Sequence, residues 1–291
     1  MPRLNQTIKL PDGRNLGYDE YGPPEGKPLL YFHGAPSSRL EWPIFSSQAL
    51  AQKLNLRVIV PDRPGIGLSD YQEGRRIRDW PKDVTALADS LGLERFAMLS
   101  YSMGGPYGLA TAASIPQRLT KVGILSGPGP FEQPGLTDGI PEASLRYFEW
   151  TRRRPWLARL MLRMFGLMAR FAGDKMVANA MAALPEPDRR AMADKEKQQG
   201  FLKMLQEATR QGPRGAWKDT LLLISPWDFR PQDISLPVQL WHGEADTNAP
   251  PAMARYVAAA IPGSRLQIYP GEGHLSLFVK HAEEILGFIA E

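Results

Sequence analysis

The sequence contains no cysteine, which excludes disulfide bridges, thiolate metal sites and a cysteine nucleophile. It also has no uninterrupted apolar run of the about 18 residues that a membrane-spanning helix needs. The N-terminal segment MPRLNQTIKLPDG lacks the apolar stretch of a secretory signal. These absences together predict a cytoplasmic protein with no membrane span.

Neither sign of charge is in large excess, because the chain has 35 basic and 31 acidic residues and a net charge of +4. No long basic block is present either, so a nucleic-acid partner is not expected. The 291 residues are 43% hydrophobic, which is enough for a large core in one domain with an insertion. The composition leaves monomer and homodimer open.

Short apolar segments alternate with helical patterns along much of the chain. Residues 6–21 predict a β-hairpin around Pro11-Asp12-Gly13, which would form an antiparallel edge. Strands are predicted at 29–32, 56–60, 95–99, 121–125, 238–241 and 266–269. Helices are predicted at 44–54, 79–91, 105–115, 252–260 and 277–290. This alternation predicts an α/β fold with a mostly parallel sheet and helices on both faces.

Residues 130–225, called the cap segment below, have no strand pattern and interrupt the sheet between its sixth and seventh strands. We therefore expect a core of residues 1–129 and 226–291 and an inserted helical cap of residues 130–225. The stretch WLARLMLRMFGLMARF at 156–171 predicts an amphipathic helix whose apolar face packs over the core. The alternative is that this helix lies on a membrane surface.

A tight turn that carries a serine joins the strand at 95–99 to the helix at 105–115. Its sequence, SYSMGG at 100–105, follows the nucleophile-elbow pattern G-x-S-x-G, except that Ser100 stands where the pattern has glycine. Residues two positions from the nucleophile must be small because strand and helix pass close together, and serine is nearly as small as glycine. The helix that follows directs its N–H groups toward Ser102. The turn therefore predicts Ser102 as a nucleophile.

A serine hydroxyl needs a base and an acid that orients the base. Among four histidines, His274 in PGEGH at 270–274 is the best placed, because it follows the last predicted strand. Asp246 follows the strand at 238–241, and open α/β sheets place their sites at this carboxyl edge. Glu132 and Glu244 remain alternative acids.

The segment FHGAP at 32–36 is a sharp turn of small residues directly after a strand. Acyl transfer needs two N–H donors for the developing oxyanion, one of them from the residue after the nucleophile, which is Met103. The turn at 32–36 predicts Ala35 as the second donor. His33 is then expected to be structural and to hold this loop through hydrogen bonds of its ring.

Five motifs together resemble the α/β-hydrolase fold superfamily over almost the full length of the chain. They are, in order, FHGAP, DRPGIGLSD at 62–70, SYSMGG, LWHGEAD at 240–246 and GEGH at 271–274. The resemblance implies a sheet of about eight strands, a helical cap above the site and hydrolysis without a cofactor.

Within this superfamily Ser102 differs from the aspartate of haloalkane dehalogenases and epoxide hydrolases, and HGAPSS at 33–38 departs from the proline iminopeptidase pattern. Carboxylesterase-like hydrolases fit best. We expect cleavage of apolar small-molecule esters of short to medium chain. Perhydrolases, C–C bond hydrolases, peptidases and weakly catalytic receptors of the same fold are the alternatives. The acyl pocket is expected to be lined by apolar residues of the cap segment, namely Leu157, Leu160, Met161, Met164, Phe165, Met168 and Phe171.

Overall fold

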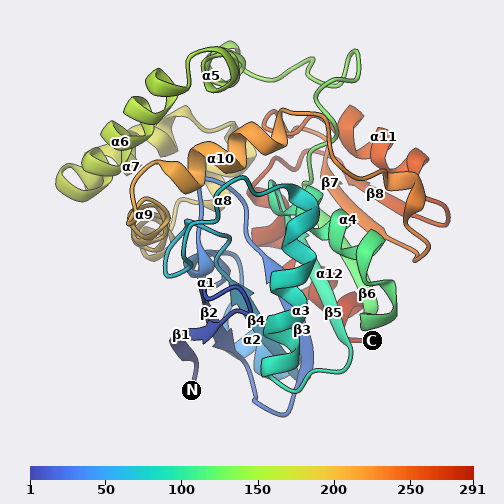
Figure 1. The fold of residues 1–291 in the computed structure, drawn as a ribbon. Helices are drawn as coiled ribbons and strands as arrows, with labels where there is room; N and C mark the ends of the chain where they lie inside the picture. Colours follow the sequence, from blue (N-terminus) through green and yellow to red (C-terminus); the bar gives the residue numbers. More distant parts are fainter.

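The computed structural model describes residues 1–291 and contains one eight-stranded sheet with helices on both faces (Figure 1). The strands are β1 (Arg3–Lys9), β2 (Asn15–Tyr21), β3 (Lys27–Phe32), β4 (Leu56–Pro61), β5 (Phe96–Tyr101), β6 (Leu119–Leu125), β7 (Gln239–Gly243) and β8 (Arg265–Tyr269). Their order in the sheet is β1-β2-β4-β3-β5-β6-β7-β8. Strands β1 and β2 pair antiparallel, as do β2 and β4, and all other pairs are parallel. The predicted fold class is confirmed.

Two apolar cores sandwich the sheet, because successive side chains of a strand point to opposite faces. On β3, Leu29 and Tyr31 face one core, whereas Leu30 and Phe32 face the other. The helices outside the cap segment are α1 (Trp42–Phe45), α2 (Gln48–Lys53), α3 (Trp80–Ser90), α4 (Gly104–Ser114), α11 (Pro251–Ala260) and α12 (Ser276–Ala290). The first core is closed by α1 and α12, and the second by α3, α4 and α11.

The prediction of a single helix over 44–54 is wrong, because two short helices, α1 and α2, occupy this region. The chain is extended at Ser46 and Ser47, between the two helices. The Ser47 hydroxyl accepts a hydrogen bond from the Leu50 N–H at 3.0 Å and so caps α2. Serine favours such a cap over a helix interior, which explains the break.

Six helices fill the cap segment and lie beyond one end of the sheet strands, at the top of Figure 1. They are α5 (Glu142–Arg153), α6 (Pro155–Phe171), α7 (Gly173–Ala183), α8 (Glu186–Ala191), α9 (Lys195–Ala208) and α10 (Arg214–Leu223). They follow β6 and precede β7 in the chain. No helix of the chain combines the length and the apolar character that crossing a membrane requires.

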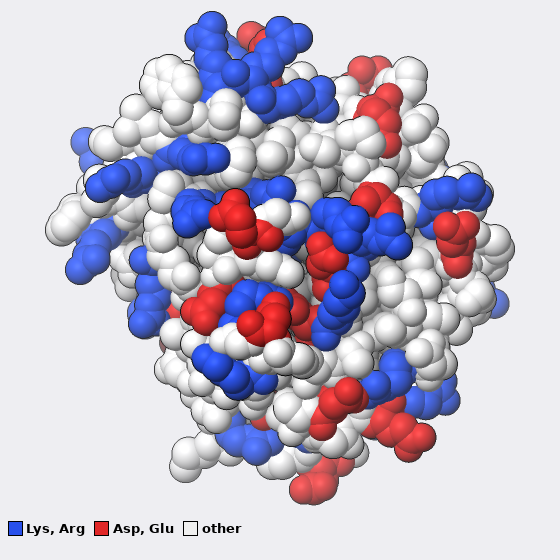
Figure 2. All heavy atoms as spheres, viewed as in Figure 1, with Lys and Arg blue, Asp and Glu red and all other residues white.

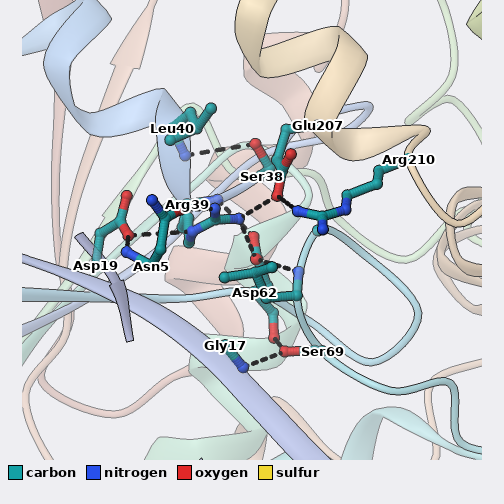
Figure 3. Close-up of polar contacts among 12 residues, drawn as sticks. Asn5, Gly17, Asp19, Ser38, Arg39, Leu40, Asp62, Ser69, Glu207 and Arg210 are labelled. Carbon is teal, nitrogen blue, oxygen red and sulfur yellow. Dashed lines mark hydrogen bonds and ion pairs between the residues drawn. The ribbon is translucent and has the colours of Figure 1, made fainter. Parts of the chain in front are cut away.

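A buried arginine ties the cap segment to the edge of the sheet (Figure 3). Arg39 pairs with Asp19 of β2 at 3.1 Å, with Asp62 after β4 at 2.8 Å and with Glu207 of α9 at 2.6 Å. The backbone N–H of Arg39 also donates to Asp62 at 2.7 Å. Removing one partner of such a cluster would leave a buried charge uncompensated, which is strongly destabilising. The cluster therefore fixes α9 against the segment that follows the turn at 32–36.

Candidate active site

Ser102 sits at the apex of a sharp turn between β5 and α4. Its φ angle of +51° lies in the left-handed region that a residue with a side chain rarely adopts. The turn is held because the Ser102 N–H donates to the Leu125 carbonyl at 2.9 Å and the Gly105 N–H donates to the Ser102 carbonyl at 2.8 Å. A Cβ atom at residue 104 would lie 2.3 Å from the Phe32 carbonyl oxygen, so Gly104 is required there.

The departure from the elbow pattern at Ser100 is accommodated by a glycine in the helix opposite. A Cβ atom at residue 108 would lie only 2.1 Å from the Ser100 Oγ, so α4 has room for this serine only because Gly108 faces it. The Ser100 hydroxyl is fully buried and has no hydrogen-bond partner. The close approach of β5 and α4 is thus made possible by Ser100 and Gly108 together, rather than by a glycine at position 100.

Three predicted site residues from different loops form one hydrogen-bonded array. The His274 Nε2 lies 2.9 Å from the Ser102 Oγ, and the His274 Nδ1 lies 2.7 Å from the Asp246 Oδ2. The other Asp246 oxygen accepts the backbone N–H groups of Asn248 and Ala249, each at 2.9 Å. Because Nδ1–H donates to the carboxylate, Nε2 is left to accept the serine proton.

The electrostatics of the array keep Asp246 ionised and make His274 a stronger base. Burial alone would lower the pKa of His274, but the charge of Asp246 and its hydrogen bond raise the pKa above the ordinary value of 6.5. The carboxylates of Asp188 and Glu41 act in the same direction. Burial would raise the pKa of Asp246, but His274 and His242 hold it below its ordinary value.

Asp188 of α8 holds the backbone of the His274 loop and was not predicted from the sequence. One of its oxygens accepts the His274 N–H at 3.1 Å, and the other accepts the N–H groups of Leu275 at 3.0 Å and Ser276 at 2.9 Å. The His274 carbonyl in turn accepts the Tyr101 hydroxyl at 3.0 Å. A buried carboxylate from the cap segment thus caps the start of α12 and fixes the position of the imidazole.

Two backbone N–H groups beside Ser102, those of Met103 and Ala35, donate no hydrogen bond within the protein. The neighbouring Gly34 N–H is occupied, because both oxygens of the buried Glu41 carboxylate accept it, at 2.9 and 3.1 Å. The loop lies against Ser102, since a Cβ atom at residue 34 would be 3.2 Å from the Ser102 Cβ. The Gly34 N–H is therefore bound to Glu41, whereas the Ala35 N–H has no acceptor within the protein.

The ring of His33 holds the loop, as the sequence predicted. Its Nδ1–H donates to the Gly34 carbonyl at 2.9 Å, and its Nε2 accepts the Arg63 N–H at 3.4 Å. Burial and the nearby Arg63 guanidinium hold the pKa of His33 well below its ordinary value, so the ring is neutral. The Arg63 side chain also donates to the carbonyls of His33 and Gly34.

A second cap-segment carboxylate, Asp219 of α10, positions Arg63. Asp219 accepts Arg63 at 2.9 Å, Arg75 at 2.6 Å and the Tyr107 hydroxyl at 2.8 Å. Burial would raise the pKa of Asp219, but the two guanidinium groups hold it well below its ordinary value. The loop with Ala35 is therefore braced by α10 just as the loop with His274 is braced by α8.

The other candidate residues make no hydrogen bond to Ser102 or His274. Glu132 and Glu244 are exposed and make no hydrogen bond to His274. His242 donates from Nε2 to the Ala249 carbonyl at 2.6 Å, and the same nitrogen lies 3.5 Å from the Asp246 Oδ2, so the ring supports the loop of Asp246. Burial lowers the pKa of His242. His281 lies on α12 near Glu284, at 3.4 Å. No group of three or more His, Asp or Glu side chains is close enough to hold a metal ion.

The apolar side chains next to the array come from α5, α10 and the loop after β6. One small cluster consists of Met103, Leu223 and Ile224, with Ala35, Phe131 and Phe148 packed against it. The prediction that α6 lines the pocket is wrong for Leu160, Met161, Met164, Met168 and Phe171, which are exposed and outside this cluster. The physical reason is that α6 packs mainly against the other cap helices α5, α7, α9 and α10.

Two curated proteins illustrate what the chain is similar to. The chain is 31% identical over 139 residues to a non-heme chloroperoxidase of Streptomyces lividans, covering 46% of this chain and 50% of that protein. It is 26% identical over 253 residues to a 2-hydroxy-6-oxo-2,4-heptadienoate hydrolase of Pseudomonas putida, covering 86% and 83%. The chain spans about half or less of the first three curated relatives, with coverages of 50%, 44% and 42%.

Solved structures share the whole fold at low sequence identity. A hydrolase of Pseudomonas aeruginosa PA01 has a TM-score of 0.70 at 20% identity, covering 98% of this chain and 97% of that one. A thermophilic esterase of Thermogutta terrifontis has a TM-score of 0.68 at 23% identity, covering 98% and 100%. A family model described as the alpha/beta hydrolase fold matches residues 27–281. With its eight-stranded sheet and its serine turn between β5 and α4, the chain belongs to the alpha/beta hydrolase fold family.

Proposed function

We propose that the protein is a serine hydrolase that cleaves apolar carboxylic esters of short to medium chain. His274 takes the proton of Ser102 as its Oγ attacks the ester carbonyl carbon, and Asp246 holds the imidazole in the required tautomer. The imidazolium then donates this proton to the departing alcohol, which leaves an acyl group on Ser102. Water, deprotonated by His274, attacks the acyl carbon, and the acid leaves as Ser102 regains its proton.

The observation that carries the proposal is the hydrogen-bonded array Asp246–His274–Ser102 beside two N–H groups without acceptors. The N–H groups of Met103 and Ala35 are proposed to bind the oxyanion, because preorganised donors of this kind stabilise developing charge. A panel of p-nitrophenyl esters of increasing acyl length, assayed for kcat/KM, tests it. Turnover of none of these esters would contradict the proposal and favour a receptor of the same fold.

A C–C bond hydrolase is the second candidate, because the relative that matches 86% of this chain carries the name of such an enzyme. The substrate in that name is a carboxylate, which would need a free cation near the serine. Arg63 and Arg75, which lie behind the loop of Ala35, are both engaged by Asp219. We therefore favour an uncharged ester, and turnover of 2-hydroxy-6-oxo-2,4-heptadienoate above that of p-nitrophenyl butyrate would reverse this preference.

The pH dependence of catalysis should report the protonation of His274. Since His274 must be neutral to accept the Ser102 proton, kcat/KM is expected to fall as the pH decreases through the pKa of His274. Asp246 raises that pKa, so the midpoint is expected above the ordinary value of 6.5. Initial rates with a neutral ester between pH 5 and 9 measure it. A flat profile, or a midpoint well below 6.5, would argue against His274 as the base.

The acyl preference should depend on Phe148 rather than on α6. Phe148 packs with Phe131 in the cluster that contains Met103, with ring centroids 5.3 Å apart. Phe148→Ala enlarges this space, so the optimum acyl chain is expected to become longer, with up to about fourfold per methylene that gains contact. The ester panel measures the shift, and Met164→Ala on α6 is the matched control, expected to leave the optimum unchanged. If Met164→Ala shifts the optimum and Phe148→Ala does not, then α6 determines the acyl preference.

A further inference from the structure

Helix α6 has a wide apolar face that nothing in the chain covers. At 100° per residue the large apolar side chains on this face span an arc of about 140°. Their exposed fractions run from 39% for Met161 to 78% for Phe171. They are Trp156, Leu160, Met161, Met164, Leu167, Met168 and Phe171. Ala158 and Ala169, on the opposite side of the helix, are fully buried.

The expectation that the apolar face of this helix packs over the core is therefore wrong. The helix packs through a narrow face of small and partly buried residues and presents its largest apolar side chains to the surface. Single exposed apolar residues are ordinary, but seven on one continuous helix face are typical of an interaction site. We call this surface the α6 apolar face.

One border of the α6 apolar face is basic. Residues 151–171 contain no acidic residue, and six arginines stand at 152, 153, 154, 159, 163 and 170. On the helix, Arg159, Arg163 and Arg170 follow one border of the apolar face, at spacings of four and seven residues that keep them on the same side. Figure 2 shows blue side chains with few red ones over the region of α5 and α6, at the upper left of the molecule.

An open groove of about 820 Å³ adjoins this basic border between α6 and α9. Arg163, Arg170, Lys203 and Arg210 line it. The first three of these cations form no salt bridge. The acid in the groove, Glu207, is already paired with Arg39 at 2.6 Å and with Arg210 at 3.4 Å. The groove therefore offers uncompensated positive charge directly beside exposed apolar side chains.

We infer that the α6 apolar face docks on an anionic phospholipid surface, with its apolar side chains at the acyl boundary and phosphate groups against Arg163, Arg170 and Lys203. Helices that combine Trp, Phe and Leu on one face with Lys and Arg beside them lie in the plane of a bilayer interface. Anionic lipids attract such basic borders. A second copy of the chain is the less favourable occupant, because a two-fold contact through this face would bring its arginines close to one another.

Co-sedimentation with vesicles tests the docking without depending on catalysis. The protein is expected to bind vesicles of phosphatidylcholine with 30% phosphatidylglycerol at least fivefold more than pure phosphatidylcholine vesicles, and binding should weaken with added salt. The double substitution Met164→Glu with Met168→Glu should reduce binding to the anionic vesicles at least fivefold. Arg163→Glu with Arg170→Glu should do the same. Both pairs are exposed, so thermal unfolding is expected to be unchanged.

Matched controls lie on other surfaces of the molecule. Leu4→Glu introduces one glutamate at an exposed apolar residue of β1, and it is compared with the single substitution Met164→Glu. Arg255→Glu with Arg265→Glu reverses two exposed arginines that form no salt bridge. Both controls should bind vesicles like the unmodified protein. Absence of binding to anionic vesicles, or equal loss in the controls, overturns the inference. A dimer in solution that Met164→Glu converts to a monomer also overturns it, since a second copy would then cover the face.

Discussion

Replacing Ser102 by alanine is expected to lower kcat for ester hydrolysis by a factor on the order of 10⁴ to 10⁶, with KM little changed. The reason is that Ser102 Oγ is the atom that His274 Nε2 contacts, at 2.9 Å, at the apex of the turn. Without it no acyl-enzyme forms, and the remaining residues supply only binding and oxyanion stabilisation. Steady-state kinetics on a p-nitrophenyl ester measures the loss, and a fluorophosphonate probe followed by peptide mapping should place its adduct on Ser102.

Ser100→Ala is the matched control for this substitution. Ser100 lies two residues away on β5, and its buried hydroxyl has no partner, so its removal leaves no other polar group unsatisfied. Activity is expected to stay within a few fold of the unmodified protein. The assignment of Ser102 fails if Ser102→Ala keeps most of the activity, or if the probe labels another serine of active protein.

The order of strands and helices could be predicted from the sequence because each element carries its own local signal. The strand at 29–32 is fully apolar and the helix at 79–91 repeats its apolar residues at helical spacing, so β3 and α3 need no information from elsewhere. The residues Ser102, Asp246 and His274 could be selected in the same way, because each follows the C-terminal end of a strand. The parallel arrangement of β5, β7 and β8 then brings them to one edge.

The residues that hold the site could not be predicted, because their importance depends on partners far away in the chain. Asp188 stands in the polar stretch EPDRRA, which looks like an exposed helix, yet its carboxylate is buried against the backbone at His274, 86 residues later. Asp219 and Arg63 are separated by 156 residues. Glu41 carries no sign that its carboxylate would occupy the Gly34 N–H.

Which face of α6 is buried could not be predicted from the sequence, for a related reason. Its apolar residues cover a wider arc than a single buried face needs, and periodicity alone does not say which part of the arc is buried. The neighbours α7, α9 and α10 decide this, and they pack against the side with the small residues Ala158 and Ala169. The exposed side of the helix therefore carries Trp156, Met164 and Phe171.

The cap segment is joined to the core at both loops that flank Ser102. Asp188 of α8 binds the loop of His274, and Asp219 of α10 binds Arg63, which donates to the carbonyls of the loop before Ala35. Because buried carboxylates with several hydrogen bonds are costly to separate from their partners, α8 and α10 are expected to stay in place during turnover. Substrate access would then depend on side chains such as Phe148 rather than on a swing of the whole cap segment.

Asp246→Asn is expected to lower kcat for ester hydrolysis by a factor of about 10³ to 10⁴ while the fold is retained. The Asp246 carboxylate accepts the His274 Nδ1–H at 2.7 Å, and an asparagine amide in its place can donate to Nδ1 and so leave the proton on Nε2. Nε2 could then no longer accept the Ser102 proton. Steady-state kinetics measures the loss, and the midpoint of the pH profile should also fall, because the charge of Asp246 is what raises the pKa of His274.

The control for this substitution is Glu244→Gln, which removes an exposed carboxylate of the same loop that has no contact with His274. It is expected to change kcat by less than about twofold and to leave the pH midpoint in place, since an exposed charge is largely screened by solvent. Glu132→Gln should behave in the same way. If Asp246→Asn is nearly silent while either glutamate substitution is severe, the acid of the array is that glutamate, and the contact between Asp246 and His274 is only structural.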